Sequence, residues 1–138
     1  CYYLGKGKLG PEESPARMPE NLLEDYIAQH IAASPDEIIR FSWHGGEPTI
    51  LGLDYFRRIT EIQRRHRPPD RRIVNGVQTN GTLLTPQKAR ELRTAGVDVV
   101  QMSVDTGEAE EHDRFRGQPG AFPGPVRGLV PGAARAYP

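Results

Sequence analysis

The sequence predicts an α/β fold in which about three parallel strands are joined by crossover helices. The first observation behind this prediction is an alternation along the chain: segments with apolar residues at helical spacing alternate with short segments rich in β-forming residues. The second is that the connections are short. Strands that alternate with helices in this way pair in parallel, because each helix carries the chain back across the sheet. The pattern is typical of a doubly wound sheet or of a segment of a barrel.

Two amphipathic helices are expected in the first half of the chain. Residues 20–33 carry apolar side chains at helical spacing and follow Pro19, a residue that is tolerated in a first helical turn. Residues 53–66 carry an apolar side chain at about every third position, among Arg, Glu and Gln. The apolar positions are Leu22, Leu23, Tyr26, Ile27 and Ile31 in the first helix and Leu53, Phe56, Ile59 and Ile62 in the second.

A third helix is bracketed by signals at both of its ends. Thr85 is a typical N-cap residue, and Pro86 suits the first helical position. Gly96 is the expected stop, because glycine readily adopts the left-handed conformation that ends many helices. These residues predict a helix that runs from Pro86 to just before Gly96.

Three short strands are expected between and after these helices, over residues 38–43, 72–79 and 97–104. Glycines and prolines break regular structure after the first two. At the other end of the chain, residues 119–138 are rich in proline and glycine, and each interior proline removes a hydrogen-bond donor that a helix needs. We therefore expect an irregular tail there.

Composition excludes several classes of partner. Eighteen Lys and Arg balance eighteen Asp and Glu, so no net field favours nucleic acid or an anionic membrane. No apolar run approaches the ~20 residues that span a bilayer. We expect a cytoplasmic protein. The single cysteine, Cys1, excludes an internal disulfide.

Polar, glycine-containing segments follow each of the three strands, at residues 44–48, 78–82 and 103–107. The carboxyl ends of parallel strands meet at one edge of the sheet, where ligands bind in α/β folds. Each segment alone is ordinary turn chemistry. Together they predict a ligand cleft.

In order along the chain, five motifs resemble those of the anaerobic sulfatase maturases, which belong to the radical S-adenosylmethionine (SAM) superfamily. They are SWHGGEPT at 42–49, LGLDYF at 51–56, QTNGTLL at 78–84, SVD at 103–105 and HDRFR at 112–116. The resemblance runs from residue 1 to about residue 118. It implies a partial TIM-type (β/α) barrel over residues 1–118.

The resemblance also implies a chemistry. The family binds a [4Fe-4S] cluster through a CxxxCxxC motif and leaves one iron open for SAM, and three thiolates suit iron-sulfur ligation. Reductive cleavage of SAM gives a 5'-deoxyadenosyl radical. In the maturases this radical takes a hydrogen from a Cys or Ser of a sulfatase, which becomes formylglycine. The implied partners are a sulfatase or other peptide substrate and an electron donor such as a flavodoxin or ferredoxin.

Motif by motif, the resemblance assigns roles to individual residues. Cys1 matches the third cluster cysteine, and Tyr3 is one of its aromatic neighbours. Gly45, Gly46 and Glu47 match the motif whose exposed backbone binds the amino group of SAM. Ser103 matches the residue that contacts the ribose, Arg116 the arginine that holds the carboxylate, and Gln78 a neighbour of cofactor or substrate.

Two departures from the family pattern leave alternatives open. The first two cluster cysteines have no counterpart in these residues, so we expect a fragment. Thr106 adds one residue to the turn after Ser103, which makes Arg114 the alternative to Arg116. The functional alternatives are a related peptide-modifying radical SAM enzyme and a catalytically dead partial barrel.

Other patterns are weaker. Residues 5–10 fit GxGxxG, but too few residues precede them to form the strand that this dinucleotide motif requires. The arginines around residues 57–72 are typical of the solvated face of a helix.

Overall fold

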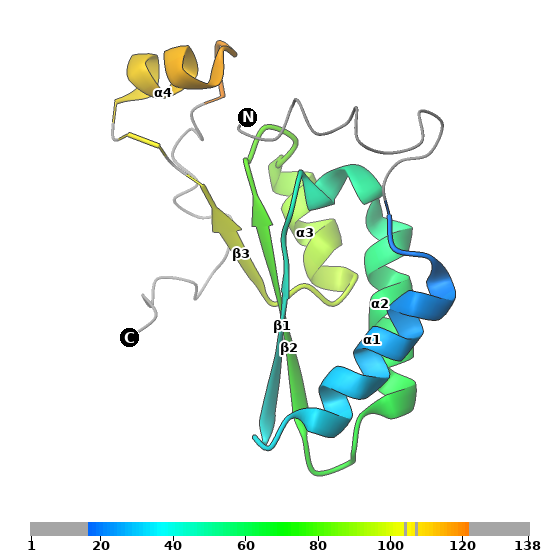
Figure 1. Ribbon diagram of the computed structural model, residues 1–138. Helices are drawn as coiled ribbons and strands as arrows, with labels where there is room; N and C mark the ends of the chain where they lie inside the picture. The colour runs from blue at the N-terminus through cyan, green and yellow to red at the C-terminus, as the bar shows by residue number, and fades with distance from the viewer. Residues whose placement is uncertain (1–16, 104, 107, 122–138) are drawn as a thin grey trace.

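A computed structural model of the chain describes residues 17–103, 105–106 and 108–121. They form a three-stranded parallel sheet in the order β1-β2-β3 (Figure 1). The strands are β1 (Ile38–Trp43), β2 (Arg72–Thr79) and β3 (Val99–Met102). The helices are α1 (Glu20–Ala33), α2 (Leu53–His66), α3 (Pro86–Thr94) and α4 (Ala109–Arg116). In Figure 1, α1, α2 and α3 cover one face of the sheet, and α4 lies beyond the end of β3.

The structure confirms the predicted order of helices and strands, and the first two helices and first two strands have the predicted bounds. The predicted third strand, over residues 97–104, was too long at both ends, because β3 begins at Val99 and ends at Met102. The Val97 N–H donates to the Leu92 carbonyl at 3.0 Å, so Val97 still belongs to the turn that ends α3. Of the predicted tail, only residues 119–121 lie within the described part of the chain.

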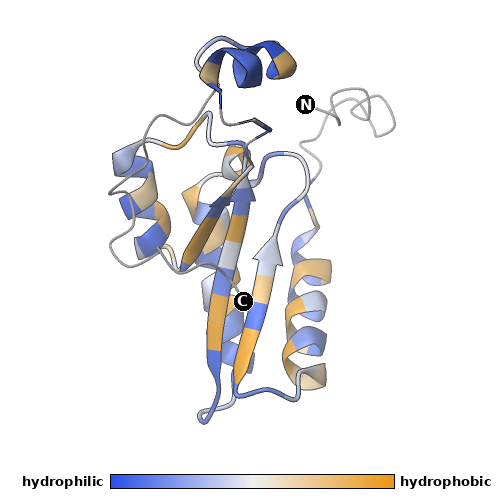
Figure 2. Cartoon of the chain, turned by 90° about the vertical axis from the view of Figure 1, so that its left-hand side faces the viewer, coloured by the Kyte–Doolittle hydropathy of each residue, from blue (hydrophilic) through white to orange (hydrophobic). Residues whose placement is uncertain are grey.

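The strand register separates two faces of the sheet. Trp43 pairs with Val77, which pairs with Val100, and these positions lie on the helix-covered face. One residue further along β2, Gln78 pairs with Gln101 on the opposite face, and both side chains are exposed. Figure 2 views the sheet from this helix-free side, with the helices α1 to α3 behind it.

The core lies between the sheet and the three helices. Packing there follows the predicted spacing, although Leu22 of α1 is exposed. Burying each Ile, Leu or Phe side chain contributes roughly 1.5–3 kcal/mol. The core residues are Leu23, Ile27, Ile31, Ile39, Phe41, Phe56, Ile59, Ile62, Val77, Leu92, Ala95 and Val97.

The ends of α3 are fixed as the sequence predicts. The Thr85 hydroxyl accepts the Lys88 N–H at 3.1 Å, and Pro86 occupies the first turn. Gly96 follows the helix with φ +96°, and a Cβ there would stand 2.3 Å from Thr60 Oγ1 of α2. Gly96 is therefore required both for its conformation and for the close approach of α2.

A buried amide pair connects the core to the end of β1. Gln63 and Asn75 exchange two hydrogen bonds, at 2.8 and 2.9 Å, and both side chains are buried. Asn75 Oδ1 also accepts the Trp43 indole N–H at 3.0 Å. Since buried amides must be satisfied, this network fixes the position of Trp43, the last residue of β1.

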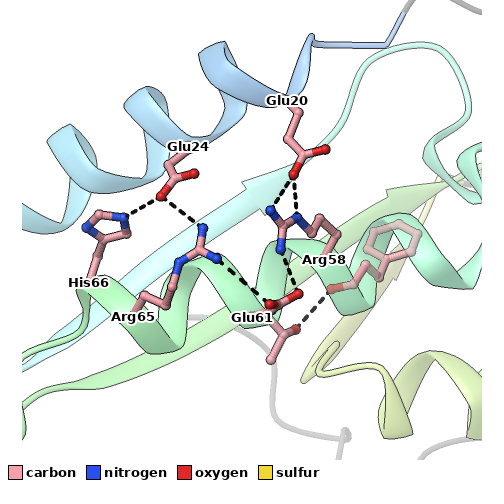
Figure 3. Close-up of polar contacts among 8 residues, drawn as sticks. Glu20, Glu24, Arg58, Glu61, Arg65 and His66 are labelled. Carbon is pink, nitrogen blue, oxygen red and sulfur yellow. Dashed lines mark hydrogen bonds and ion pairs between the residues drawn. The ribbon is translucent and has the colours of Figure 1, made fainter.

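Ion pairs join α1 to α2 along their solvent side (Figure 3). Arg58 binds Glu20 and Glu61, and Arg65 binds Glu24 at 2.9 Å. These side chains are largely exposed, so water and salt screen them and each pair contributes little alone.

In the described part of the chain, no helix has both the length and the apolar character needed to cross a membrane.

Candidate functional site

The three polar segments predicted to form a cleft meet at the carboxyl edge of the sheet. In Figure 2 the strands point the same way, and the segments that follow them lie together with α4 at the top. Hydrogen bonds join the segments directly. Glu47 after β1 binds Asn80 after β2, and the Ser103 N–H after β3 donates to the Thr79 carbonyl at 3.1 Å.

The segment after β1 exposes its backbone. Gly45 has φ +101° and Gly46 has φ +59°, which are backbone conformations that residues with a Cβ rarely adopt. Both glycines are exposed, and a Cβ built on either one meets no atom of the described residues within 4 Å. Conformation rather than crowding therefore requires glycine here, and the result is an open stretch of peptide groups at the sheet edge.

Glu47 holds this stretch through its carboxylate. Oε1 accepts the Thr49 N–H at 3.1 Å, the Thr49 hydroxyl at 2.5 Å and the Thr79 hydroxyl at 2.7 Å. Oε2 accepts the Asn80 N–H at 2.8 Å. The same contacts cap the short 3-10 helix η2 (Pro48–Leu51) that follows. Neither this helix nor the role of Thr49 and Thr79 was predicted from the sequence.

Gln78 and Ser103 meet on the helix-free side of the sheet. Gln78 Nε2 donates to Ser103 Oγ at 3.2 Å. Two of the predicted site residues, 25 positions apart in the sequence, therefore form one polar group between β2 and β3.

Arg116 reaches the same edge from α4. Its Nε donates to Asp105 Oδ2 at 2.6 Å, and its NH2 group donates to the Ser103 carbonyl at 3.0 Å. The hydrogen bond from Arg116 holds the pKa of Asp105 below its usual value. The Asp105 N–H donates to Nδ1 of His112, a residue that is completely buried. Asp105 and His112 thus anchor the helix that carries Arg116.

Arg114, the alternative to Arg116, points elsewhere. The Arg114 side chain is 79% exposed, whereas the Arg116 side chain is 15% exposed. The NH2 group of Arg114 lies 3.6 Å from Oε1 of Glu111 on the same helix. The geometry brings Arg116 to Ser103 and leaves Arg114 in solvent.

Two predicted site residues, Cys1 and Tyr3, lie outside the described residues. Among those that the structure does describe, no group of three or more His, Cys, Asp and Glu side chains is placed to hold a metal ion. His66 Nε2 lies 3.1 Å from Glu24 Oε1. A shallow hollow on α4 is lined by Glu110, Asp113, Arg114, Gly117, Gln118 and Pro119.

Comparison with known proteins identifies relatives of this arrangement. The family model described as the Radical SAM superfamily matches residues 1–122. A serine-type anaerobic sulfatase-maturating enzyme of Bacteroides thetaiotaomicron is 36% identical over 116 residues, which are 84% of this chain and 27% of that protein. An AdoMet-dependent heme synthase of Methanosarcina barkeri is 45% identical over 85 residues, 62% of this chain and 22% of that protein.

Solved structures agree with these relatives. The structure described as native anSMEcpe with bound AdoMet and Kp18Cys peptide has a TM-score of 0.64 and 30% identity, covering 83% of this chain and 29% of that one. The structure described as native anSMEcpe with bound AdoMet has a TM-score of 0.60 and 33% identity, covering 70% and 26%.

The chain spans less than a third of the length of the relatives that it matches. Its three parallel strands and crossover helices are a part of the TIM-type fold of these neighbours, as predicted. The motifs, the parallel sheet and the family match agree: the chain belongs to the radical SAM superfamily.

Proposed function

We propose that this chain forms the SAM-binding edge of a radical enzyme that modifies a protein or peptide, in the manner of the sulfatase-maturating relatives. One observation carries the proposal. An exposed glycine backbone after β1, a serine after β3 and an arginine of α4 lie at one edge of a parallel sheet.

The groups at this edge match the three polar parts of SAM. The open backbone at Gly45 and Gly46 suits the amino group, and the Ser103 hydroxyl suits a ribose hydroxyl. A guanidinium suits the carboxylate because the two groups form charge-assisted hydrogen bonds. Arg116 uses Nε for Asp105 and its NH2 group for the Ser103 carbonyl, so a ligand carboxylate would take the remaining N–H groups of the guanidinium.

The iron-sulfur cluster fits the residues only in part. The 138 residues contain one cysteine, whereas the motif of the family uses three. We assign Cys1 as one ligand and place Tyr3 beside it, and the other two thiolates must come from outside these residues. When bound together, cluster and SAM supply a 5'-deoxyadenosyl radical for hydrogen abstraction, after one-electron reduction by a flavodoxin or ferredoxin.

A Cys or Ser of a sulfatase is the substrate that the relatives favour. Sulfatase-maturating enzymes match 79–84% of this chain, whereas the heme synthases match at most 62%. On this wider match we favour a peptide substrate over a tetrapyrrole. A related peptide-modifying enzyme is the second candidate.

An exchange of segments tests the proposal. The matching 116 residues of the Bacteroides enzyme would be replaced by those of this chain, and the folded, reconstituted chimera assayed anaerobically for SAM binding, 5'-deoxyadenosine and formylglycine. SAM binding and 5'-deoxyadenosine formation by the chimera support the proposal, and formylglycine formation supports a sulfatase as the substrate. A folded chimera that does not bind SAM contradicts the proposal. SAM binding without 5'-deoxyadenosine would favour the catalytically dead alternative. The same chimera with Arg116→Ala is the control.

A further inference from the structure

The Glu47 carboxylate is the point at which the segment after β1 is fixed to β2. It accepts four hydrogen bonds from described residues, two of them from Thr49 in its own segment. The other two come from β2 and the residue that follows it: the Thr79 hydroxyl at 2.7 Å and the Asn80 N–H at 2.8 Å. These last two bonds connect residues more than 30 positions apart in the sequence.

Gly45 and Gly46 depend on their flanks for their position. Both have positive φ, and among the described residues no atom outside their chain neighbours lies within 4 Å of where a Cβ would be. The flanking residue before them, Trp43, is held by Asn75 at 3.0 Å. The flanking residue after them is Glu47. The conformation of the two glycines therefore rests on Glu47 and its partners.

Thr79 is the last residue of β2, at the carboxyl edge of the sheet. It is 2% exposed and shares the helix-covered face with Val77, whereas Gln78 points to the helix-free face and binds Ser103. The Thr79 hydroxyl donates to Glu47 at 2.7 Å and also accepts the Gly81 N–H at 3.1 Å in the turn after β2.

We propose that Thr79 is a positioning residue that acts through Glu47 to hold the Gly45-Gly46 backbone in its binding conformation, a role that rests on the proposed function of this backbone in binding SAM. The side chain of Glu47 is engaged with the protein, and its contribution to the ligand is the position of the backbone. Removing the Thr79 hydroxyl leaves a charged acceptor without one of its donors, and the segment shifts.

Thr79→Val is the direct test, because valine keeps the shape of threonine and suits a strand. We expect the SAM dissociation constant of the chain, measured by calorimetry, to rise about tenfold, the usual size for loss of a hydrogen bond to a charged group. Thr79→Ser restores the hydroxyl and should bind within about twofold of the parent chain. Thr94→Val is the matched control, since that hydroxyl bonds only to Arg90 within α3 at 3.0 Å among the described contacts.

Hydrogen exchange distinguishes a local change at the Glu47 contacts from a general loss of stability. In Thr79→Val the Asn80 amide, which binds Glu47, should lose protection, while the Val77 amide in the middle of β2 keeps it. If Thr79→Val does not fold, Thr49→Val removes the other hydroxyl on Glu47 Oε1 and should weaken SAM binding in the same direction.

Unchanged SAM affinity in a folded Thr79→Val chain, or equal loss of protection at Asn80 and Val77, overturns the inference. If the parent chain itself does not bind SAM, the proposed function fails. In that case the exchange rate of Asn80 still decides whether Thr79 positions the segment.

Discussion

The Arg116 guanidinium binds the Asp105 carboxylate, with Nε 2.6 Å from Oδ2, and the same guanidinium binds the carbonyl of Ser103. This contact attaches α4 to the end of β3. It also places the cation of Arg116 beside the serine that we assign to the ribose.

Stability should depend on the ionisation of Asp105. The hydrogen bond from Arg116 lowers the pKa of Asp105, so the ion pair stabilises the fold above the ordinary aspartate pKa. That contribution disappears as the pH falls through the lowered pKa. The difference in urea midpoint between the parent chain and Asp105→Asn should be constant near neutral pH and shrink below about pH 4.

Asp54→Asn provides the control for this titration, because Asp54 and Arg57 form an ion pair on the exposed side of α2. It should show a much smaller difference in urea midpoint. A difference for Asp105→Asn that persists unchanged to pH 2 would contradict the account.

Arg116→Ala should weaken SAM binding by about tenfold or more, because it removes a charged partner of the ligand carboxylate. Arg114→Ala should change it by less than about twofold, since the Arg114 side chain is 79% exposed and lies near Glu111. Calorimetric titration of both variants decides between the two arginines. Weaker binding in Arg114→Ala alone would reverse the assignment.

The sequence predicted the fold wherever local patterns were strong. Apolar spacing located α1 and α2, and Thr85, Pro86 and Gly96 marked the ends of α3. It gave no signal for α4, whose only fully buried residue among those described is His112 and whose Phe115 is 74% exposed. An amphipathic stripe is absent there, so periodicity could not reveal the helix.

The site was predictable only in part, for a physical reason. Motifs identified Gly45, Ser103 and Arg116 by resemblance. The partners of Glu47 could not be found in this way, because the Thr79 contact joins residues 32 positions apart and depends on how β1 and β2 pair. Asp105 was recognised as part of a motif, but its contact with Arg116 required the position of α4.

Gly96→Ala should destabilise the chain by about 2 kcal/mol or more. The left-handed conformation costs roughly 1–2 kcal/mol for a residue with a Cβ, and the Cβ also collides with Thr60 Oγ1. In a Thr60→Ala background the collision is relieved, so the added cost should fall to about 1 kcal/mol. A double-mutant cycle by urea unfolding measures this coupling, and strictly additive costs would show that Thr60 is not the obstacle.

Gln63→Leu should cost about 1–3 kcal/mol, because it removes both hydrogen bonds that Gln63 exchanges with the buried amide of Asn75. Gln87→Leu is the matched control. Gln87 is exposed and, among the described contacts, its side chain bonds only to Glu91 on the same helix. The free energy of unfolding of Gln87→Leu should therefore fall by no more than about 0.5 kcal/mol. Equal free energies of unfolding for the two variants would mean that the amide pair does not stabilise the core.

We propose that the carboxyl edge of this sheet binds SAM. Amide chemical shifts, measured while SAM is titrated into the chain, show whether it does. We predict saturable shifts at Gly45, Gly46 and Ser103. The hollow on α4 lined by Glu110 and Asp113 is the internal comparison, and its amides should stay unchanged. No saturable shift at the two glycines and Ser103, or shifts confined to the α4 hollow, would contradict the claim.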